Sequence, residues 1–303
     1  DFVAFINYLN LLTWPMMAMG WVTNLIQRGA ASLDRINKIL ETRPEIVDAP
    51  EATELTDFKG EVGFENISFR YRSGDANVID NLSINVPSGG VLGIVGPQGG
   101  GKTTLLRLIP RLYDVRSGRI TIDGKDVRNI QLADLRRHIG FVSQEPFLFS
   151  GTIRENVAFG KAATDEEIRR TIRAAALDET IAEFPNGLDT IVGEKGVILS
   201  GGQKQRIVLA RALIHETPII LLDDPIGQVD TETASRIIQT LRNLSGSRTL
   251  IIVSHRIPAV QFAERIIVLD QGRIIESGTH AQLIEKGGYY ANTYQIQSLE
   301  AAE

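Results

Sequence analysis

Gly96-Pro-Gln-Gly-Gly-Gly-Lys102-Thr103 stands between a short apolar run, Val91–Val95, and a helical pattern that extends to Leu112. This order of strand, glycine-rich loop and helix is typical of a phosphate-binding loop. Glycines let backbone N–H groups turn toward phosphate oxygens, and the helix N-terminus adds partial positive charge. A lysine at this spacing reaches the β- and γ-phosphates, and the hydroxyl after it ligates magnesium. An ordinary glycine-rich turn is the alternative. The residues predicted to hold a nucleotide are Gly96, Pro97, Gln98, Gly99, Gly100, Gly101, Lys102, Thr103 and Thr104.

Composition narrows the remaining choices. The chain has 303 residues with a formal net charge of -5, so it is long enough for one large domain or two and lacks the charge of a nucleic-acid-binding protein. With no cysteine, disulfides and cysteine-ligated metals are excluded, and four scattered histidines make no zinc motif. The expected metal is Mg²⁺ carried with the nucleotide.

The first segment has the composition of a membrane helix. Phe2–Gln27 contains no Asp, Glu, Lys or Arg, and as a helix it exceeds the ~30 Å hydrocarbon core. A buried or interfacial helix is the alternative. A signal peptide is disfavoured because no basic n-region precedes the apolar run. Four basic residues follow the apolar run, so the positive-inside rule predicts that everything after it is cytoplasmic. These residues are Arg28, Arg35, Lys38 and Arg43.

The domain boundaries follow from the change in composition. A helical pattern continues through Ala30–Glu41, and then two prolines with several acidic residues indicate a linker. One helix cannot line a path across a bilayer, so we expect this chain to be the C-terminal part of a longer polypeptide. The predicted organisation is a last transmembrane helix with its extension at 1–42, a linker at 43–60 and a nucleotide-binding domain at 61–303.

The domain itself shows an α/β pattern. Continuously apolar strands separated by helical patterns predict a parallel sheet covered on both faces. The stretch 152–198 has almost no strand signal, so we expect a helical subdomain at roughly 146–204. The predicted helices are Lys102–Leu112, Asp165–Ala176, Gly202–Ile214 and Thr231–Leu244. The predicted strands are Val62–Tyr71, Ile79–Val86, Val91–Val95, Ile139–Ser143, Ile219–Leu222, Thr249–Val253 and Arg265–Leu269.

Two further motifs belong with the phosphate loop. The apolar run Ile219–Leu222 ends in Asp223, which at the edge of a parallel sheet can hold magnesium through water. The second motif, Leu199-Ser-Gly-Gly-Gln203, opens a helix. Ser200 is a plausible N-cap, and Gly201 and Gly202 leave bare N–H groups, which makes a second anion site.

Together these motifs resemble the ATP-binding cassette (ABC) transporters, and the resemblance covers Gly60 to about Tyr294. In that family the Leu-Ser-Gly-Gly-Gln signature of one domain closes over ATP held by the phosphate loop of another. The resemblance implies that Ser200, Gly201, Gly202 and Gln203 contact a partner's nucleotide. It also implies a P-loop (RecA-like) core with a helical subdomain, and ATP and Mg²⁺ as cofactors.

Other positions match the family one by one. The resemblance implies that Tyr71 stacks on adenine, that Gln144 reaches the magnesium and the attacking water, and that His255 contacts the γ-phosphate. It implies that Asp230 lies in the loop that crosses the dimer interface. The stretch Thr190–Gly196 is similar to an exporter-type loop that touches the membrane domains. For each residue the alternative is an ordinary structural role in a strand, loop or turn.

A membrane helix fused before such a domain is similar to exporter half-transporters, which carry six membrane helices each. The resemblance therefore implies an ATP-driven export subunit in a bacterial-type inner or plasma membrane, paired with a second half-transporter. The transported substrate is left open. A regulatory ATP-binding module that scarcely hydrolyses is a second hypothesis. A non-transport ATPase acting on DNA or the ribosome is disfavoured by Phe2–Gln27 and the acidic net charge.

One position departs from the family pattern. Asp224 stands where a glutamate usually polarises the attacking water, and Gly227 stands where a serine is usual. The carboxylate is one methylene short, and a misplacement of ~1 Å can cost on the order of a hundredfold in rate. We expect ATP binding to survive and hydrolysis at this site to be slow, as in one subunit of heterodimeric exporters. An active homodimer with a conservative exchange is the alternative.

Overall fold

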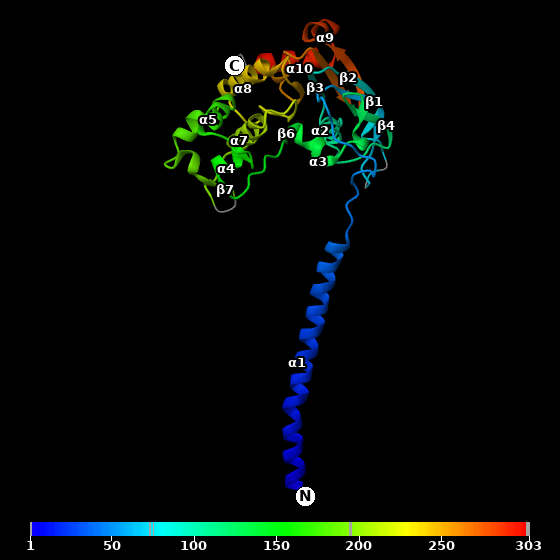
Figure 1. Cartoon of the computed structure of the whole chain (residues 1–303), viewed down its shortest axis with the longest axis vertical. Coiled ribbons are helices and arrows are strands. Elements are labelled where there is room, and N and C mark those ends of the chain that lie inside the picture. Colours follow the sequence, from blue (N-terminus) through cyan, green and yellow to red (C-terminus); the bar gives the residue numbers. More distant parts are fainter. Residues whose placement is uncertain (1, 73, 75, 194–195, 301–303) are drawn as a thin grey trace. The chain divides into compact units, whose positions relative to one another are not determined.

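The computed structural model describes residues 2–72, 74, 76–193 and 196–300, which divide into two compact units, Asp1–Val47 and Asp48–Glu303 (Figure 1). The first unit is formed by the long helix α1 (Phe2–Glu41), which contains Pro15 and none of whose residues is buried. Among the helices described, only α1 is long and apolar enough to cross a membrane. The predicted continuation of the helix through Ala30–Glu41 is present.

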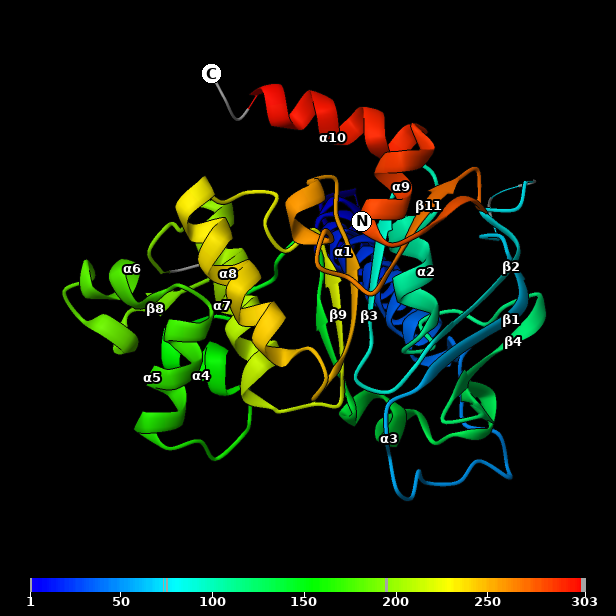
Figure 2. The same ribbon diagram turned by 90° about the horizontal axis from the view of Figure 1, so that it is seen from above.

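A six-stranded sheet in the order β12-β11-β3-β10-β9-β6 forms the centre of the second unit (Figure 2). Neighbouring strands are parallel except β12, which pairs with β11 in the antiparallel sense at one edge. The apolar runs are continuous because alternate side chains enter different cores. Leu92 and Ile94 join one core, and Val91 and Val95 join the other. The strands are β3 (Val91–Val95), β6 (Ile139–Val142), β9 (Ile219–Asp223), β10 (Thr249–Val253), β11 (Arg265–Asp270) and β12 (Arg273–Gly278).

A second sheet, not predicted from the sequence, has the order β2-β1-β4-β5 and is antiparallel. Two strands predicted from apolar runs belong here rather than to the parallel sheet. The side chains of β2 alternate between buried and exposed because one face of this sheet is open. The first of its strands ends at Phe69, before Tyr71. The strands are β1 (Val62–Phe69), β2 (Ile79–Val86), β4 (Ser117–Ile122) and β5 (Lys125–Asp126).

Helices cover both faces of the six-stranded sheet. Figure 2 shows α2 between the two sheets, with α7 and α8 on the opposite face. The predicted helix Lys102–Leu112 ends earlier, at Leu108. The residues after the sixth strand form short helices and a two-stranded pair, β7 (Gly151–Thr152) with β8 (Ile191–Val192). The helices are α2 (Lys102–Leu108), α3 (Leu132–Arg137), α4 (Ile153–Ala158), α5 (Asp165–Ala174), α6 (Asp178–Ala182), α7 (Gly201–Ile214), α8 (Thr231–Leu244), α9 (His280–Lys286) and α10 (Tyr289–Glu300). The 3-10 turns in the described part of the chain are η1 (Val127–Asn129), η2 (Gly187–Asp189) and η3 (Ile257–Ala259).

Candidate nucleotide-binding site

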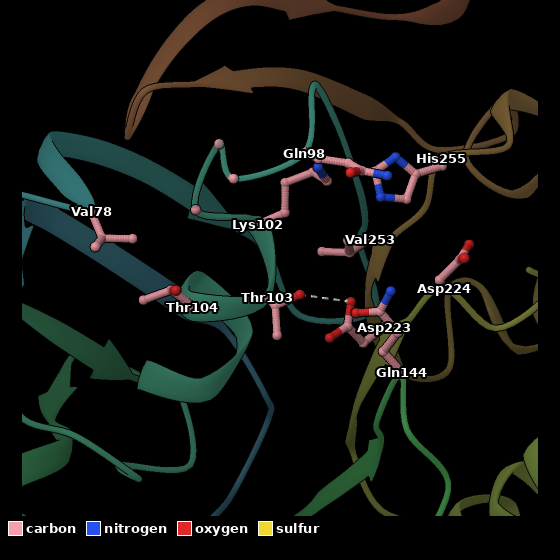
Figure 3. A pocket seen from close by; sticks show the side chains of 13 residues that line it. Val78, Gln98, Lys102, Thr103, Thr104, Gln144, Asp223, Asp224, Val253 and His255 are labelled. Carbon is pink, nitrogen blue, oxygen red and sulfur yellow. Dashed lines mark hydrogen bonds between the residues drawn. The ribbon is translucent and has the colours of Figure 1, made fainter. Parts of the chain in front are cut away.

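An open cavity of about 510 Å³ lies where strands β3, β6, β9 and β10 end, and it contains most of the residues predicted for the site (Figure 3). The carboxyl ends of parallel strands meet at one edge of a sheet, which is why motifs far apart in the sequence converge here. Val78 and Val253 add apolar surface. The predicted residues that line the cavity are Gln98, Gly99, Gly100, Gly101, Lys102, Thr103, Thr104, Gln144, Asp223, Asp224 and His255.

Glycine is required at two positions of the loop by close backbone approach. Gly96 has φ +140°, and a Cβ built on it would lie 2.1 Å from the carbonyl oxygen of Leu269. Gly101, with φ +97°, precedes α2, and its Cβ would lie 2.7 Å from the carbonyl oxygen of Val78. A side chain at either position would force the backbone apart, so the loop can curl with its N–H groups inward only with glycine.

Two of the three residues predicted to hold magnesium, Thr103 and Asp223, are in contact. Thr103 Oγ1 donates to Asp223 Oδ1 at 3.2 Å, as the dashed line in Figure 3 marks. Asp223 is 2% exposed, and burial raises the pKa of its carboxyl group although the Thr103 hydroxyl opposes the shift. No group of three or more His, Cys, Asp or Glu in the described part of the chain could hold a metal. A buried carboxylate beside a hydroxyl fits Mg²⁺, which prefers one or two protein oxygens together with substrate phosphates.

The Lys102 side chain is held by backbone carbonyl groups of the phosphate loop. Its Nζ donates to the carbonyl oxygens of Gly96 at 2.9 Å and Pro97 at 2.7 Å. Burial lowers the pKa of the Lys102 ammonium, while the charges of Asp223 and Asp224 counteract that shift. The ammonium is therefore positioned beside the cavity, where the carbonyl contacts can be exchanged for phosphate oxygens.

Asp224 has a left-handed backbone, with φ +54°, which is uncommon for a residue with a side chain. Its N–H donates to the carbonyl of Val253 at 2.7 Å, and its carbonyl accepts from Gln205 Nε2 at 2.5 Å. The carboxylate accepts from Ser254 Oγ at 2.8 Å, and a Cβ on Gly227 would lie 2.0 Å from Asp224 Oδ2. The glycine at 227 thus leaves the space that the carboxylate occupies.

Gln144 and His255 reach the cavity from two different strands. Gln144 lies just after β6, and His255 lies just after β10. In Figure 3 the His255 ring lies near Gln98, at the opposite side of the cavity from the Thr103–Asp223 pair. The geometry therefore places a neutral amide near the magnesium ligands and an imidazole near the loop.

Tyr71 lies beside the phosphate loop and does not line the cavity. Its hydroxyl and Thr104 Oγ1 are 3.0 Å apart, and either can donate. The ring makes edge contacts with Phe69, at 4.9 Å between centroids, and with Tyr113, at 5.2 Å. An aromatic cluster next to the loop is compatible with base stacking, and the structure adds the link to Thr104 that the sequence did not indicate.

The signature residues are not brought to the cavity. Ser200 caps α7 in a capping box with Gln203, and Gly201 and Gly202 lie against Gln228. Asp230 caps α8 by accepting from the N–H of Thr233 at 2.9 Å, which lowers the pKa of its carboxyl group. These residues form a second polar surface, separate from the cavity of the same domain. In the predicted loop Thr190–Gly196, Glu194 and Lys195 lie outside the described residues.

Two residues that hold Asp224 were not predicted from the sequence. Gln205 is 2% exposed, and its amide donates to the Asp224 carbonyl. Ser254 precedes His255 and donates to the Asp224 carboxylate. Their positions, one turn into the signature helix and directly before the predicted histidine, were the available signals.

Comparison with known proteins finds relatives that match nearly all of this chain. The family model described as ABC transporter matches residues 79–227. The chain is 43% identical over 297 residues to an ATP-dependent lipid A-core flippase of Desulfotalea psychrophila, with 98% of this chain and 52% of the relative covered. It is 41% identical over 304 residues to a probable multidrug resistance ABC transporter ATP-binding/permease protein of Bacillus subtilis, covering 100% of this chain and 52% of that relative.

A solved structure of a bacterial Atm1-family ABC exporter with ATP bound is similar as well, with a TM-score of 0.84 and 38% identity. The similarity covers 96% of this chain and 51% of that chain. The chain thus spans about half the length of the curated relatives it matches. The match includes the segment of α1 as well as the α/β unit.

Proposed function

The chain belongs to the ABC transporter family, and we propose that it is the ATP-binding part of an exporter subunit that couples ATP binding and hydrolysis to export. The observation that carries this proposal is the cavity in which the phosphate loop, the Thr103–Asp223 pair, Gln144 and His255 meet. The relatives support the exporter branch, since their names include a lipid A-core flippase and an ATP-binding/permease protein.

In this proposal, different residues of the cavity bind the phosphates, hold Mg²⁺ and act on the attacking water. The N–H groups of the loop and the Lys102 ammonium bind the phosphates, and the ammonium neutralises charge that builds up between them. Thr103, Asp223 and Gln144 are the residues that would hold Mg²⁺, which when bound neutralises phosphate charge and orients the terminal phosphate. His255 donates to the terminal phosphate, and Asp224 orients and accepts a proton from water.

We propose further that the site of this chain is the slow one in a heterodimer of half-transporters. The Asp224 carboxylate is one methylene shorter than glutamate, and it is turned toward Ser254 by a hydrogen bond of 2.8 Å. The signature at Ser200–Gln203 is complete and lies on a separate surface, so it can complete the site of a partner. An active homodimer is the alternative, which the same experiments separate.

The first test compares the two surfaces in the assembled, membrane-reconstituted protein. We expect Lys102→Ala to leave most of the steady-state ATPase intact, because turnover occurs mainly at the partner's site. Ser200→Arg should abolish that turnover, because the partner's nucleotide needs this signature. Equal loss from Lys102→Ala and from the matching change in the partner would contradict the slow-site proposal. Normal ATPase after Ser200→Arg would contradict the shared site.

The second test extends the carboxylate. Asp224→Glu should raise the single-turnover hydrolysis rate at this site at least about tenfold, a part of the ~10²–10⁴ that a fully placed general base contributes. Asp224→Asn is the matched control, and it should lower the rate while Mg-ATP affinity is retained. A regulatory module that only binds ATP would show no single-turnover hydrolysis in the wild-type protein. An unchanged rate in Asp224→Glu would mean that the shorter carboxylate is not what limits this site.

A further inference from the structure

Helix α10 reaches the loop that carries His255. The Gln297 side chain contacts this loop at two points: its Nε2 donates to the carbonyl oxygen of His255 at 2.6 Å, and its Oε1 accepts from the N–H of Ile257 at 2.8 Å. Only one orientation of the amide satisfies both contacts, because one partner is an acceptor and the other a donor. The Gln297 side chain therefore fixes both the position and the direction of the backbone at 255–257.

The helix that presents Gln297 is anchored independently of this loop. Tyr290 is fully buried, and its hydroxyl lies 2.8 Å from His280 Nδ1. The N–H groups of Tyr289 and Tyr290 donate to the carboxylate of Glu276 in β12. A polar side chain on such a rigid support can hold a partner more precisely than one on a loop.

The segment 254–257 also contacts the other side of the site. Ser254 Oγ donates to Asp224 Oδ1, and Arg256 Nη1 donates to the carbonyls of Ile226 at 3.0 Å and Val229 at 3.1 Å. These carbonyls belong to the turn between Asp224 and Asp230. Segment 254–257 thus links α10 to the Asp224 turn and carries His255 between them.

We propose that Gln297 is a positioning residue that holds His255 where it contacts the terminal phosphate of a bound nucleoside triphosphate. The inference rests on the proposed function, since it assigns the His255 contact to that phosphate. A diphosphate lacks the group that His255 touches. Loss of the two Gln297 contacts therefore weakens triphosphate binding and leaves diphosphate binding unchanged.

The test measures binding of ATP and of ADP, each with Mg²⁺, to the membrane-reconstituted protein under conditions in which hydrolysis is blocked by low temperature. Gln297→Leu removes both contacts, and Gln297→Glu keeps the acceptor for Ile257 while it removes the donor to His255. Gln295→Leu is the matched control, because Gln295 is exposed on the same helix. We expect the preference for ATP over ADP to fall about tenfold in both Gln297 variants, as for loss of a hydrogen bond to a charged group, and not in Gln295→Leu.

The same measurement in a His255→Ala background separates positioning from a general loss of structure. There Gln297→Leu should have no further effect on the ATP preference. An unchanged preference in Gln297→Leu with the wild-type histidine would overturn this inference alone. Equal falls in ATP and ADP affinity, or an equal fall in the His255→Ala background, would overturn it too. A wild-type protein that binds neither nucleotide overturns the proposed function and this inference together.

Discussion

At the scale of single residues, Asp224 and the Gln205 side chain that contacts it are both held in unfavourable states. Asp224 adopts a left-handed backbone, which costs of order 1 kcal/mol or more for a residue that is not glycine. The Gln205 amide, the Val253 carbonyl and the Ser254 hydroxyl each contact Asp224. The oxygen of the same Gln205 amide, Oε1, is buried without a hydrogen-bond partner. Stability is given up here to fix one carboxylate, as is usual at functional sites.

Asp223 gives a prediction on stability that can be read from pH. Burial raises the pKa of its carboxyl group above the ordinary 3.8, so the folded protein binds this proton more tightly than the unfolded chain does. The free energy of unfolding then falls as pH rises through the window above 3.8. Asn has no charge to desolvate. Asp223→Asn should therefore raise the Tm of the nucleotide-free protein by about 2 °C at pH 7, and by less near pH 4.

Thermal unfolding at several pH values, followed by circular dichroism, checks this expectation. The control is Asp230→Asn, since Asp230 is an exposed helix cap whose pKa is lowered by the N–H of Thr233. That control should show no gain at neutral pH. A Tm for Asp223→Asn at or below the wild-type value at pH 7 would show that the carboxylate is not a stability cost in the absence of nucleotide.

At the scale of elements, Arg211 connects the signature helix α7 to helix α4 and to the loop that follows Gln144. Its guanidinium donates to the carbonyls of Asn156 at 2.9 Å and Phe147 at 3.0 Å, and to Asn156 Oδ1 at 2.9 Å. It also lies over the ring of Phe159, 4.8 Å from its centroid. Since the Gln144 loop and the signature helix belong to different surfaces, this arginine connects them through one half-buried side chain.

Replacing this arginine tests the connection. Arg211→Met keeps much of the apolar length but removes three hydrogen bonds, and of the three acceptors Asn156 Oδ1 still has the N–H of Phe149 as a donor. We expect the free energy of unfolding to fall by about 2–3 kcal/mol. Hydrogen exchange should rise mainly in 147–159. Arg170→Met is the control, because its pair with Glu216 at 2.8 Å is exposed and worth at most about 1 kcal/mol. Similar losses in both variants would show that Arg211 has no special role.

Elements and motifs differed in how far the sequence predicted them. The strands of the six-stranded sheet are buried on both faces, so apolar runs such as Ile219–Leu222 were sufficient. Strand β4 was missed because its first half, Ser117, Gly118 and Arg119, is exposed and polar. Helix α10 was missed because it buries only Tyr290.

The residues of the site also differed in how far the sequence predicted them. Contiguous motifs gave Lys102, Thr103 and Asp223, whereas contacts of Gln205 and Gln297 depend on which segments pack together in three dimensions. Such pairs, 19 and 40 residues apart in the sequence, leave no periodic pattern to detect. The structure places these residues, but the roles proposed for all the predicted site residues stay predictions. They include Lys102, Thr103, Asp223, Asp224, His255, Tyr71, Gln144, Ser200–Gln203 and Asp230.

At the scale of the whole molecule, the α/β unit carries two separate surfaces that we propose bind anions. One is the cavity with Lys102, and the other is the N-terminus of α7 at Ser200. A single nucleotide in the cavity does not need the second surface of the same domain. This supports the proposal that two such units act together, each completing the site of the other.

The N-terminal unit gives a prediction about orientation in the membrane. The apolar part of α1, Phe2–Gln27, has no ionisable Asp, Glu, Lys or Arg, and basic residues such as Arg28 and Arg35 follow it directly. Because Lys and Arg are enriched on the cytoplasmic side of membrane helices, we expect these side chains to be cytoplasmic. The unit Asp48–Glu303 should therefore be cytoplasmic.

Trypsin added to sealed right-side-out vesicles should leave that unit intact, whereas trypsin added to inside-out vesicles should cleave it. Lysing the right-side-out vesicles with detergent is the control, since cleavage must then appear. Digestion in intact right-side-out vesicles, or release of the protein by alkaline carbonate, would mean that α1 does not span the membrane in this orientation.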